Sequence, residues 1–166
     1  DDGTGSATVL TAFEAVVKSK LKFQRNLYFA FYSAEEYGLI GSQRMVADFR
    51  NKNIPVMAAL QFDMTGYNSP NEEELFFLVA DYTDPNLNQF IRQIAITYLG
   101  LTASQIGTTR CGYACSDHAS WMDGGVPAAI PFEASFNNMN RTLHTNRDVM
   151  GILDINYAFR FVQIAI

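Results

Sequence analysis

The sequence contains little positive charge: no run of basic residues occurs, and the net charge is -5. A surface that binds nucleic acid needs clustered Lys and Arg to displace counterions from phosphate, so a nucleic-acid partner is excluded. Long apolar runs are also missing, because the longest stretches, residues 27–32 and 126–132, fall far short of the ~20 residues that cross a bilayer. We therefore expect neither nucleic-acid binding nor a membrane span.

The chain also lacks the basic and then apolar regions that mark a signal peptide, and it opens directly on two acids and a glycine-rich turn. What it does have is the composition of a folded domain, with 48% apolar and 17% charged residues. Its 166 residues are enough for one hydrophobic core. We interpret residues 1–166 as one domain, cut from a larger protein at its amino end and slightly at its carboxyl end.

Apolar residues recur at helical spacing in four segments and form compact β-rich runs in four others. Helices are predicted over residues 6–20, 42–51, 86–98 and 153–166, and strands over residues 26–33, 56–64, 75–80 and 126–132. Strands separated by helices imply an α/β fold. We expect a three-layer sandwich in which helices flank a mixed, largely parallel central sheet.

Acidic residues follow two of the predicted strands. Glu35 and Glu36 come directly after the first strand, and Asp63 lies near the end of the second. Ligands of α/β sheets bind beyond the carboxyl ends of the strands. A Glu-Glu pair is usually a solvated surface dipeptide, whereas a carboxylate in an apolar run is costly to bury unless a cation or strong hydrogen bonds meet it. Asp63 is therefore a candidate functional residue, with a hydrogen-bonded turn or cap as its alternative.

The two histidines differ in context. His118 precedes Trp121 by three residues on a predicted short helix, which is typical of a buried hydrogen-bonding residue rather than a ligand. His144 lies in an irregular polar loop where no helical or strand pattern requires it. It is a candidate ligand, although surface histidines are more common in such loops. Asp1, taken alone, reads as a turn or N-cap residue before the first helix.

Several motifs occur in a fixed order along nearly the whole chain. They are Asp-Asp-x-Thr-Gly at residues 1–5, Ala-Glu-Glu-x-Gly-x-x-Gly-Ser at 34–42, Cys-Gly-Tyr-Ala-Cys-Ser-Asp-His-Ala-Ser-Trp at 111–121, Pro-Phe-Glu at 131–133 and His-Thr at 144–145. Together they resemble the zinc aminopeptidase family typified by bacterial secreted leucyl aminopeptidases, which are exopeptidases with two co-catalytic zinc ions. Each motif alone is weak, so the resemblance depends on their order and context.

The resemblance implies a role for each matching residue. Asp1 would bridge two zinc ions, with Asp63 completing one site and Glu36 and His144 the other. Glu35 would be the general base that activates water. Mixed carboxylate and imidazole ligands suit catalytic zinc, which keeps an open position. The remaining ligand in the family is a histidine before Asp1, outside these 166 residues, so we expect the site with Asp63 to be incomplete and the fragment alone to be inactive.

The same resemblance implies a substrate-binding region and a disulfide. Tyr113 would donate a hydrogen bond to the developing oxyanion. An apolar recess for the first side chain of the peptide would be formed by Met64, Ile130, Phe132, Phe136 and Leu143, although some of these are equally expected in the core. Cys111 and Cys115 would form a disulfide; a zinc-binding pair normally has two intervening residues and a second pair elsewhere. A disulfide implies export, so the protein is expected to be secreted or periplasmic.

These implications predict a metallo-aminopeptidase, a monomer, that hydrolyses the amino-terminal bond of peptides with a free amino end and a large apolar first residue. Two alternatives remain open. One is a glutaminyl cyclase-like acyltransferase with a single zinc ion, which metal stoichiometry would distinguish. The other is a non-catalytic binding module with the peptidase fold, which hydrolysis of a chromogenic leucine amide would exclude.

Overall fold

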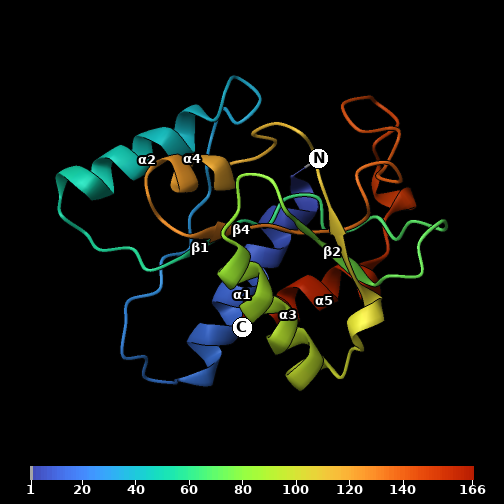
Figure 1. Ribbon diagram of the computed structural model, residues 1–166, viewed down its shortest axis with the longest axis horizontal. Helices are drawn as coiled ribbons and strands as arrows, with labels where there is room; N and C mark the ends of the chain where they lie inside the picture. Colours follow the sequence, from blue (N-terminus) through green and yellow to red (C-terminus); the bar gives the residue numbers. More distant parts are fainter. Residues whose placement is uncertain (1) are drawn as a thin grey trace.

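The computed structural model describes residues 2–166, and its elements alternate along the chain (Figure 1). The helices are α1 (Gly3–Ser19), α2 (Ile40–Asn51), α3 (Pro85–Leu99), α4 (His118–Asp123) and α5 (Ile155–Ala165), with short 3-10 turns at Ala103–Gln105 and Met150–Ile152. The strands are β1 (Ala59–Leu60), β2 (Phe76–Val79), β3 (Ile106–Thr109), β4 (Ala128–Ala129) and β5 (Pro131–Phe132).

The strands form two small sheets, and the helices form two groups. In the three-stranded sheet, β2 lies between β3, to which it is parallel, and β5, to which it is antiparallel. The second sheet is the parallel pair of β1 and β4. One helix group contains α1, α3 and α5, and the other contains α2 and α4 (Figure 1). The predicted α/β fold with a mixed sheet flanked by helices is confirmed.

Strand β2 separates two apolar clusters, because successive side chains of a strand point to opposite faces. Phe76 and Leu78 pack with Ile91 of α3 and Phe161 of α5 in the main core. The intervening side chains of β2 face a second cluster on the other side. That second cluster contains Phe77, Val79, Met64, Ile130 and Phe132, with Cys111, Phe136, Met139 and Leu143 packed against it.

The Phe77 ring lies directly over Gly107 of the neighbouring strand β3. A Cβ on Gly107 would come within 2.2 Å of the Phe77 ring carbons. Such a distance is far below van der Waals contact, so glycine at this position makes the room that the ring occupies.

Local capping signals explain where α3 begins and ends and where α5 begins. The Asp84 side chain accepts a hydrogen bond from Leu87 N at 2.8 Å, Pro85 occupies the first turn of α3, and Gly100 ends the helix with a φ of 68°. These are the residue types that favour helix starts and stops. Asp154 caps α5 in the same way. No helix among residues 2–166 is both long and apolar enough to span a bilayer.

The predicted strands are only partly confirmed. Residues 75–80 contain β2, but residues 26–33 form no strand ladder within the described part of the chain, and Leu27, Tyr28 and Phe31 there are about half exposed. An apolar run indicates burial but does not supply a partner backbone to hydrogen-bond with. The strand predicted at 56–64 shortens to β1, the one at 126–132 divides into β4 and β5, and β3 was not predicted.

Candidate functional site

The loop before α2 and the loop after β5 bring Glu36 and His144 together. Glu36 Oε1 lies 2.7 Å from His144 Nε2, and both side chains are more than half exposed. Two backbones here adopt the left-handed conformation without being glycine: Ala34 and His144 each have a φ of 58°. Such residues are uncommon and cluster at functional sites, where surrounding contacts hold them. Glu36 and His144 thus form a carboxylate and imidazole pair at the surface.

Glu35 lies in a tight turn that folds onto the start of α2. Its carbonyl oxygen accepts hydrogen bonds from Gly38 N at 2.9 Å and Leu39 N at 2.8 Å. Gly41 allows this turn to close, because a Cβ there would lie 2.4 Å from Ser33 O. Burial raises the pKa of Glu35 to about 7, with the negative charges of Asp63, Glu36 and Asp117 adding to the effect and His144 opposing it.

Asp63 is half-buried, and hydrogen bonds meet its carboxylate. Oδ1 accepts from Met64 N at 2.9 Å, and Oδ2 accepts from the Ser116 hydroxyl at 2.8 Å. Since the charges of Asp63 and Glu36 both raise the pKa of Glu35, the three carboxylates share one neighbourhood. The sequence predicted that strong hydrogen bonds or a cation would compensate the burial of this carboxylate. These two hydrogen bonds provide such compensation.

The fit of these residues to zinc can be judged from their donor types. Zinc in proteins takes carboxylate oxygen and imidazole nitrogen, which Glu36, His144 and Asp63 offer. Within residues 2–166, however, no group of three or more His, Cys, Asp or Glu side chains is arranged closely enough to hold a metal ion. Asp1, the predicted bridging ligand, lies outside the described residues. The Glu36 and His144 pair therefore fits part of a zinc donor set.

The first turn of α1 packs directly on the Asp63 segment. Thr4 Oγ1 accepts a hydrogen bond from Thr65 N at 3.2 Å, and the buried hydroxyls of Thr8 and Thr65 are 3.2 Å apart. Gly5 allows the close approach, because it has no side chain to meet the backbone of Asp63. The start of α1 is thus fixed against the loop that carries Asp63.

A disulfide joins Cys111 and Cys115, as the resemblance implied, and the five-residue ring contains Tyr113. Tyr113 is 56% exposed, and its ring lies edge-on to Phe136 with the centroids 6.2 Å apart. The disulfide ring also contacts Asp81, whose carboxylate accepts from Gly112 N of this ring and from Arg110 Nη1 just before it, each at 2.8 Å. Tyr113 therefore lies at the surface, beside the second apolar cluster.

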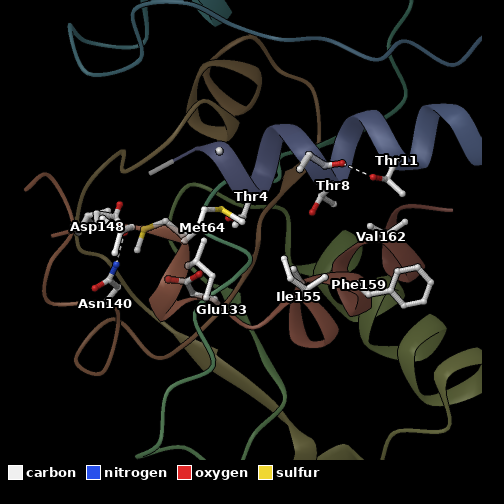
Figure 2. Close-up of a pocket in the computed structure, with 17 residues that line it drawn as sticks. Thr4, Thr8, Thr11, Met64, Glu133, Asn140, Asp148, Ile155, Phe159 and Val162 are labelled. Carbon is white, nitrogen blue, oxygen red and sulfur yellow. Dashed lines mark hydrogen bonds between the residues drawn. The ribbon is translucent and has the colours of Figure 1, made fainter. Parts of the chain in front are cut away.

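The five residues predicted to form an apolar recess all belong to that second cluster. Met64, Ile130 and Phe132 are buried, while Phe136 and Leu143 are partly buried and pack against them. Met64 and Leu143 also line a separate cavity of about 530 Å³ between α1 and α5. Figure 2 shows Thr4 and Thr8 of α1 on one side of this cavity and Phe159 and Val162 of α5 on the other.

Glu133 was missed as a buried polar residue of the site. Its Oε2 accepts from Gly66 N at 2.9 Å and Tyr67 N at 2.8 Å, and its own N–H donates to Met64 O at 3.2 Å. Burial raises the pKa of Glu133 to about 7 against these hydrogen bonds. The sequence held the signal, because Glu133, like Asp63, is a carboxylate at the end of an apolar strand.

A buried group of hydroxyls and one carboxylate joins α2 to α4 and was also missed. The Ser42 hydroxyl hydrogen-bonds Asp117 and lies 2.7 Å from the Ser120 hydroxyl, and all three residues are buried. Ser116, which donates to Asp63, directly precedes Asp117. His118 is fully buried with Nε2 3.3 Å from Asp81 O, so the prediction of a buried hydrogen-bonding histidine is confirmed.

Comparison with known proteins identifies the family. The model of peptidase family M28 matches residues 1–165. The chain belongs to this family. Leucine aminopeptidase 1 of Ajellomyces capsulatus is 35% identical over 174 aligned residues, which cover 100% of this chain and 44% of that protein. The crystal structure of the LapA aminopeptidase of Legionella pneumophila superposes with a TM-score of 0.93 at 40% identity, covering 99% of this chain and 44% of LapA.

A second Legionella pneumophila structure, LapB, superposes with a TM-score of 0.91 at 35% identity and covers 99% of this chain and 44% of LapB. The chain thus spans less than half the length of the M28 relatives that it matches. The fold and family membership extend along essentially the whole chain, whereas the activity of the complete protein is a matter for proposal.

Proposed function

We propose that this protein is a zinc aminopeptidase that hydrolyses the amino-terminal bond of peptides with a large apolar first residue. The observation that carries the proposal is the pairing of Glu36 Oε1 with His144 Nε2 at 2.7 Å beside Glu35, in a chain of family M28. The names of the relatives support the reaction type, since one is called a leucine aminopeptidase and another an aminopeptidase.

Four residues would hold two zinc ions in this proposal. Glu36 and His144 would belong to one ion, Asp63 to the other, and Asp1 would be shared, with a histidine upstream of Asp1 as the further ligand. When bound, the two ions would lower the pKa of a water molecule and polarise the scissile carbonyl group. The hydrogen bonds from Ser116 and Met64 N would orient the Asp63 carboxylate for its role.

Glu35 would act as the general base and then as the general acid. Its carboxylate would take a proton from the attacking water and deliver it to the departing amine. Hydrogen bonds from Gly38 N and Leu39 N to its carbonyl oxygen support this role, because they fix the turn that presents the side chain. Tyr113 would donate its hydroxyl proton in a hydrogen bond to the developing oxyanion.

The second apolar cluster would receive the first side chain of the substrate. Its members are apolar, and burial of an apolar side chain contributes about 25 cal/mol per Å² of apolar surface. Peptides with a free amino end would be the substrates and the protein would act as a monomer. The disulfide supports a secreted or periplasmic location, because such bonds persist in oxidising compartments.

The test is hydrolysis of leucine p-nitroanilide by the complete protein, together with its zinc content. We expect hydrolysis, loss of hydrolysis on chelation, recovery with zinc and two zinc ions per chain. Cyclisation of a glutaminyl peptide with one zinc ion per chain would favour a glutaminyl cyclase-like reaction instead. Zinc-loaded protein that does neither would contradict the proposal and indicate a binding module.

A further inference from the structure

Asp81 and Arg110 lie at the same edge of the three-stranded sheet because β2 and β3 are parallel. Each residue follows shortly after the end of its strand, and Ala80 N donates to Thr109 O at 2.9 Å to continue the pairing. The Asp81 side chain is 13% exposed and meets Arg110 Nη1 at 2.8 Å. Directly after Arg110 the chain enters the disulfide ring that contains Tyr113.

The backbone of Asp81 is anchored independently of this ion pair. Its carbonyl oxygen lies 3.3 Å from Nε2 of the fully buried His118. The turn that follows is tied to the end of β2, since the Thr83 hydroxyl donates to Val79 O at 2.7 Å and Asn88 Nδ2 donates to the same oxygen at 2.9 Å. Asp81 is therefore a fixed point from which its carboxylate reaches the disulfide ring.

Within the ring, Gly112 presents its N–H to that carboxylate. Gly112 N donates to Asp81 Oδ2 at 2.8 Å, and its φ of 82° is one that side-chain-bearing residues rarely adopt. Nothing lies within 4 Å of a Cβ placed on Gly112, so the backbone conformation, not lack of space, favours glycine here. This backbone conformation directs the Gly112 N–H at the Asp81 carboxylate.

The contacts of Asp81 with Gly112 and Arg110 differ in kind. The Gly112 N–H is the first cause that lowers the pKa of Asp81, burial opposes it, and the hydrogen bond and charge of Arg110 and the Cys111 N–H lower it further. The Arg110 side chain is 73% exposed, and exposed ion pairs contribute little. The bond from Gly112 N to the Asp81 carboxylate is charge-assisted as well, and its donor is a backbone N–H inside the disulfide ring and not the end of an exposed side chain. The disulfide fixes the internal shape of the ring, while the bond to Gly112 determines where the ring sits against the sheet.

We propose that Asp81 is a positioning residue that holds Tyr113 at the mouth of the apolar recess, and that it acts through the Gly112 N–H and not through Arg110. This inference rests on the proposed function of the site. It assigns the role of aligning the oxyanion donor to a residue outside the proposed zinc ligands and the proposed substrate recess. The alignment matters because a displacement of about 1 Å can cost about 100-fold in rate.

The experiment uses the complete protein and the variants Asp81→Ala, Asp81→Asn, Arg110→Ala and Tyr113→Phe. We expect Asp81→Ala to lower kcat for leucine p-nitroanilide about 10- to 100-fold while zinc content and KM change little. Asp81→Asn retains an oxygen that can accept from Gly112 N, so it should recover most of kcat. Arg110→Ala, the matched control that removes the ion pair alone, should retain nearly all of it.

A double-mutant cycle separates positioning from a general structural effect. In the Tyr113→Phe background, which already lacks the donor, Asp81→Ala should cause no further loss of kcat. An equal loss in both backgrounds would overturn the proposal, as would a loss in Arg110→Ala as large as that in Asp81→Ala.

Amide hydrogen exchange of residues 110–116 tests the contact without any activity. Asp81→Ala should remove protection at Gly112, whereas Arg110→Ala should retain it. Unchanged protection in Asp81→Ala would overturn the positioning role even in an active enzyme. If Asp81→Ala removes the protection but the wild-type protein hydrolyses no peptide, the proposed function is refuted and the contact between Asp81 and the ring is established.

Discussion

Gly5 of α1 lies against the backbone of Asp63. A Cβ on Gly5 would be 2.8 Å from Asp63 Cα and 2.3 Å from Phe62 O. Real Cβ atoms essentially never approach other atoms so closely, so any side chain at this position would push the helix away from the loop. The glycine at the end of the Asp-Asp-x-Thr-Gly motif thus has a packing reason: it brings the start of the helix to the Asp63 loop.

Gly5→Ala should therefore destabilise the protein by about 1 to 3 kcal/mol and lower its zinc content, because the first turn of α1 must move away from Asp63. Gly3→Ala is the matched control in the same turn, since nothing lies within 4 Å of its Cβ. It should change stability by less than about 1 kcal/mol. Urea unfolding and zinc analysis would measure both, and equal effects of the two variants would contradict the packing argument.

Neighbouring carboxylates should respond differently to the same substitution. Glu35→Gln should leave zinc content intact and lower kcat by about 10² to 10⁴, the usual contribution of a general base. Glu36→Gln should lower zinc occupancy, because it removes the carboxylate paired with His144. Metal analysis and leucine p-nitroanilide kinetics on the complete protein provide the comparison. Near-normal turnover in Glu35→Gln would remove it from the mechanism.

His118 should make the protein less stable in acid. Burial lowers its pKa from 6.5 to about 4, so between these values the unfolded chain binds a proton that the folded chain does not. The free energy of unfolding is therefore unaffected by His118 above pH 6.5. It decreases as the pH falls below this value, by about 3 kcal/mol at pH 4 and below. Unfolding curves of wild type and His118→Asn from pH 4 to 8 would measure this loss. Only the wild type should show this contribution to the pH dependence of the free energy of unfolding.

Glu133 should act in the opposite direction. Burial raises its pKa from 4.5 to about 7, so the folded chain holds a proton that the unfolded chain releases, and stability is lost as the pH rises through 7. Glu133→Gln stays neutral and can still accept from Gly66 N and Tyr67 N. The free energy of unfolding of the variant, relative to that of the wild type, should therefore rise by about 3 kcal/mol between pH 4.5 and 8. A difference that does not vary with pH would disprove the assignment.

Helices were easier to predict from the sequence than strands. The periodicity and caps of α3 and α5 are local, so the sequence around Asp84 and Asp154 contains them. A strand depends on a partner elsewhere in the chain. Residues 26–33 have the apolar run but no ladder in the described chain, and β3 was missed because Gly107 and two threonines give it a weak apolar pattern.

The candidate site shows the same division between local and distant information. The approach of Glu36 to His144 was expected from the family resemblance and not from spacing, since no pattern joins residues so far apart. Glu133 carried the same signal as Asp63 and could have been found. The bond from Gly112 to Asp81 could not, because it depends on two parallel strands ending side by side.

The packing of Phe77 on Gly107 restricts which substitutions the two positions can accept in this family. The aromatic ring occupies the space left by the absent side chain on the next strand, so neither position can be altered freely while the other is kept. A larger residue at 107 becomes acceptable only with a smaller one at 77, and we expect the two positions to covary among relatives. Since Phe77 also packs in the second apolar cluster, each such exchange would repack the side chains on that face of the sheet.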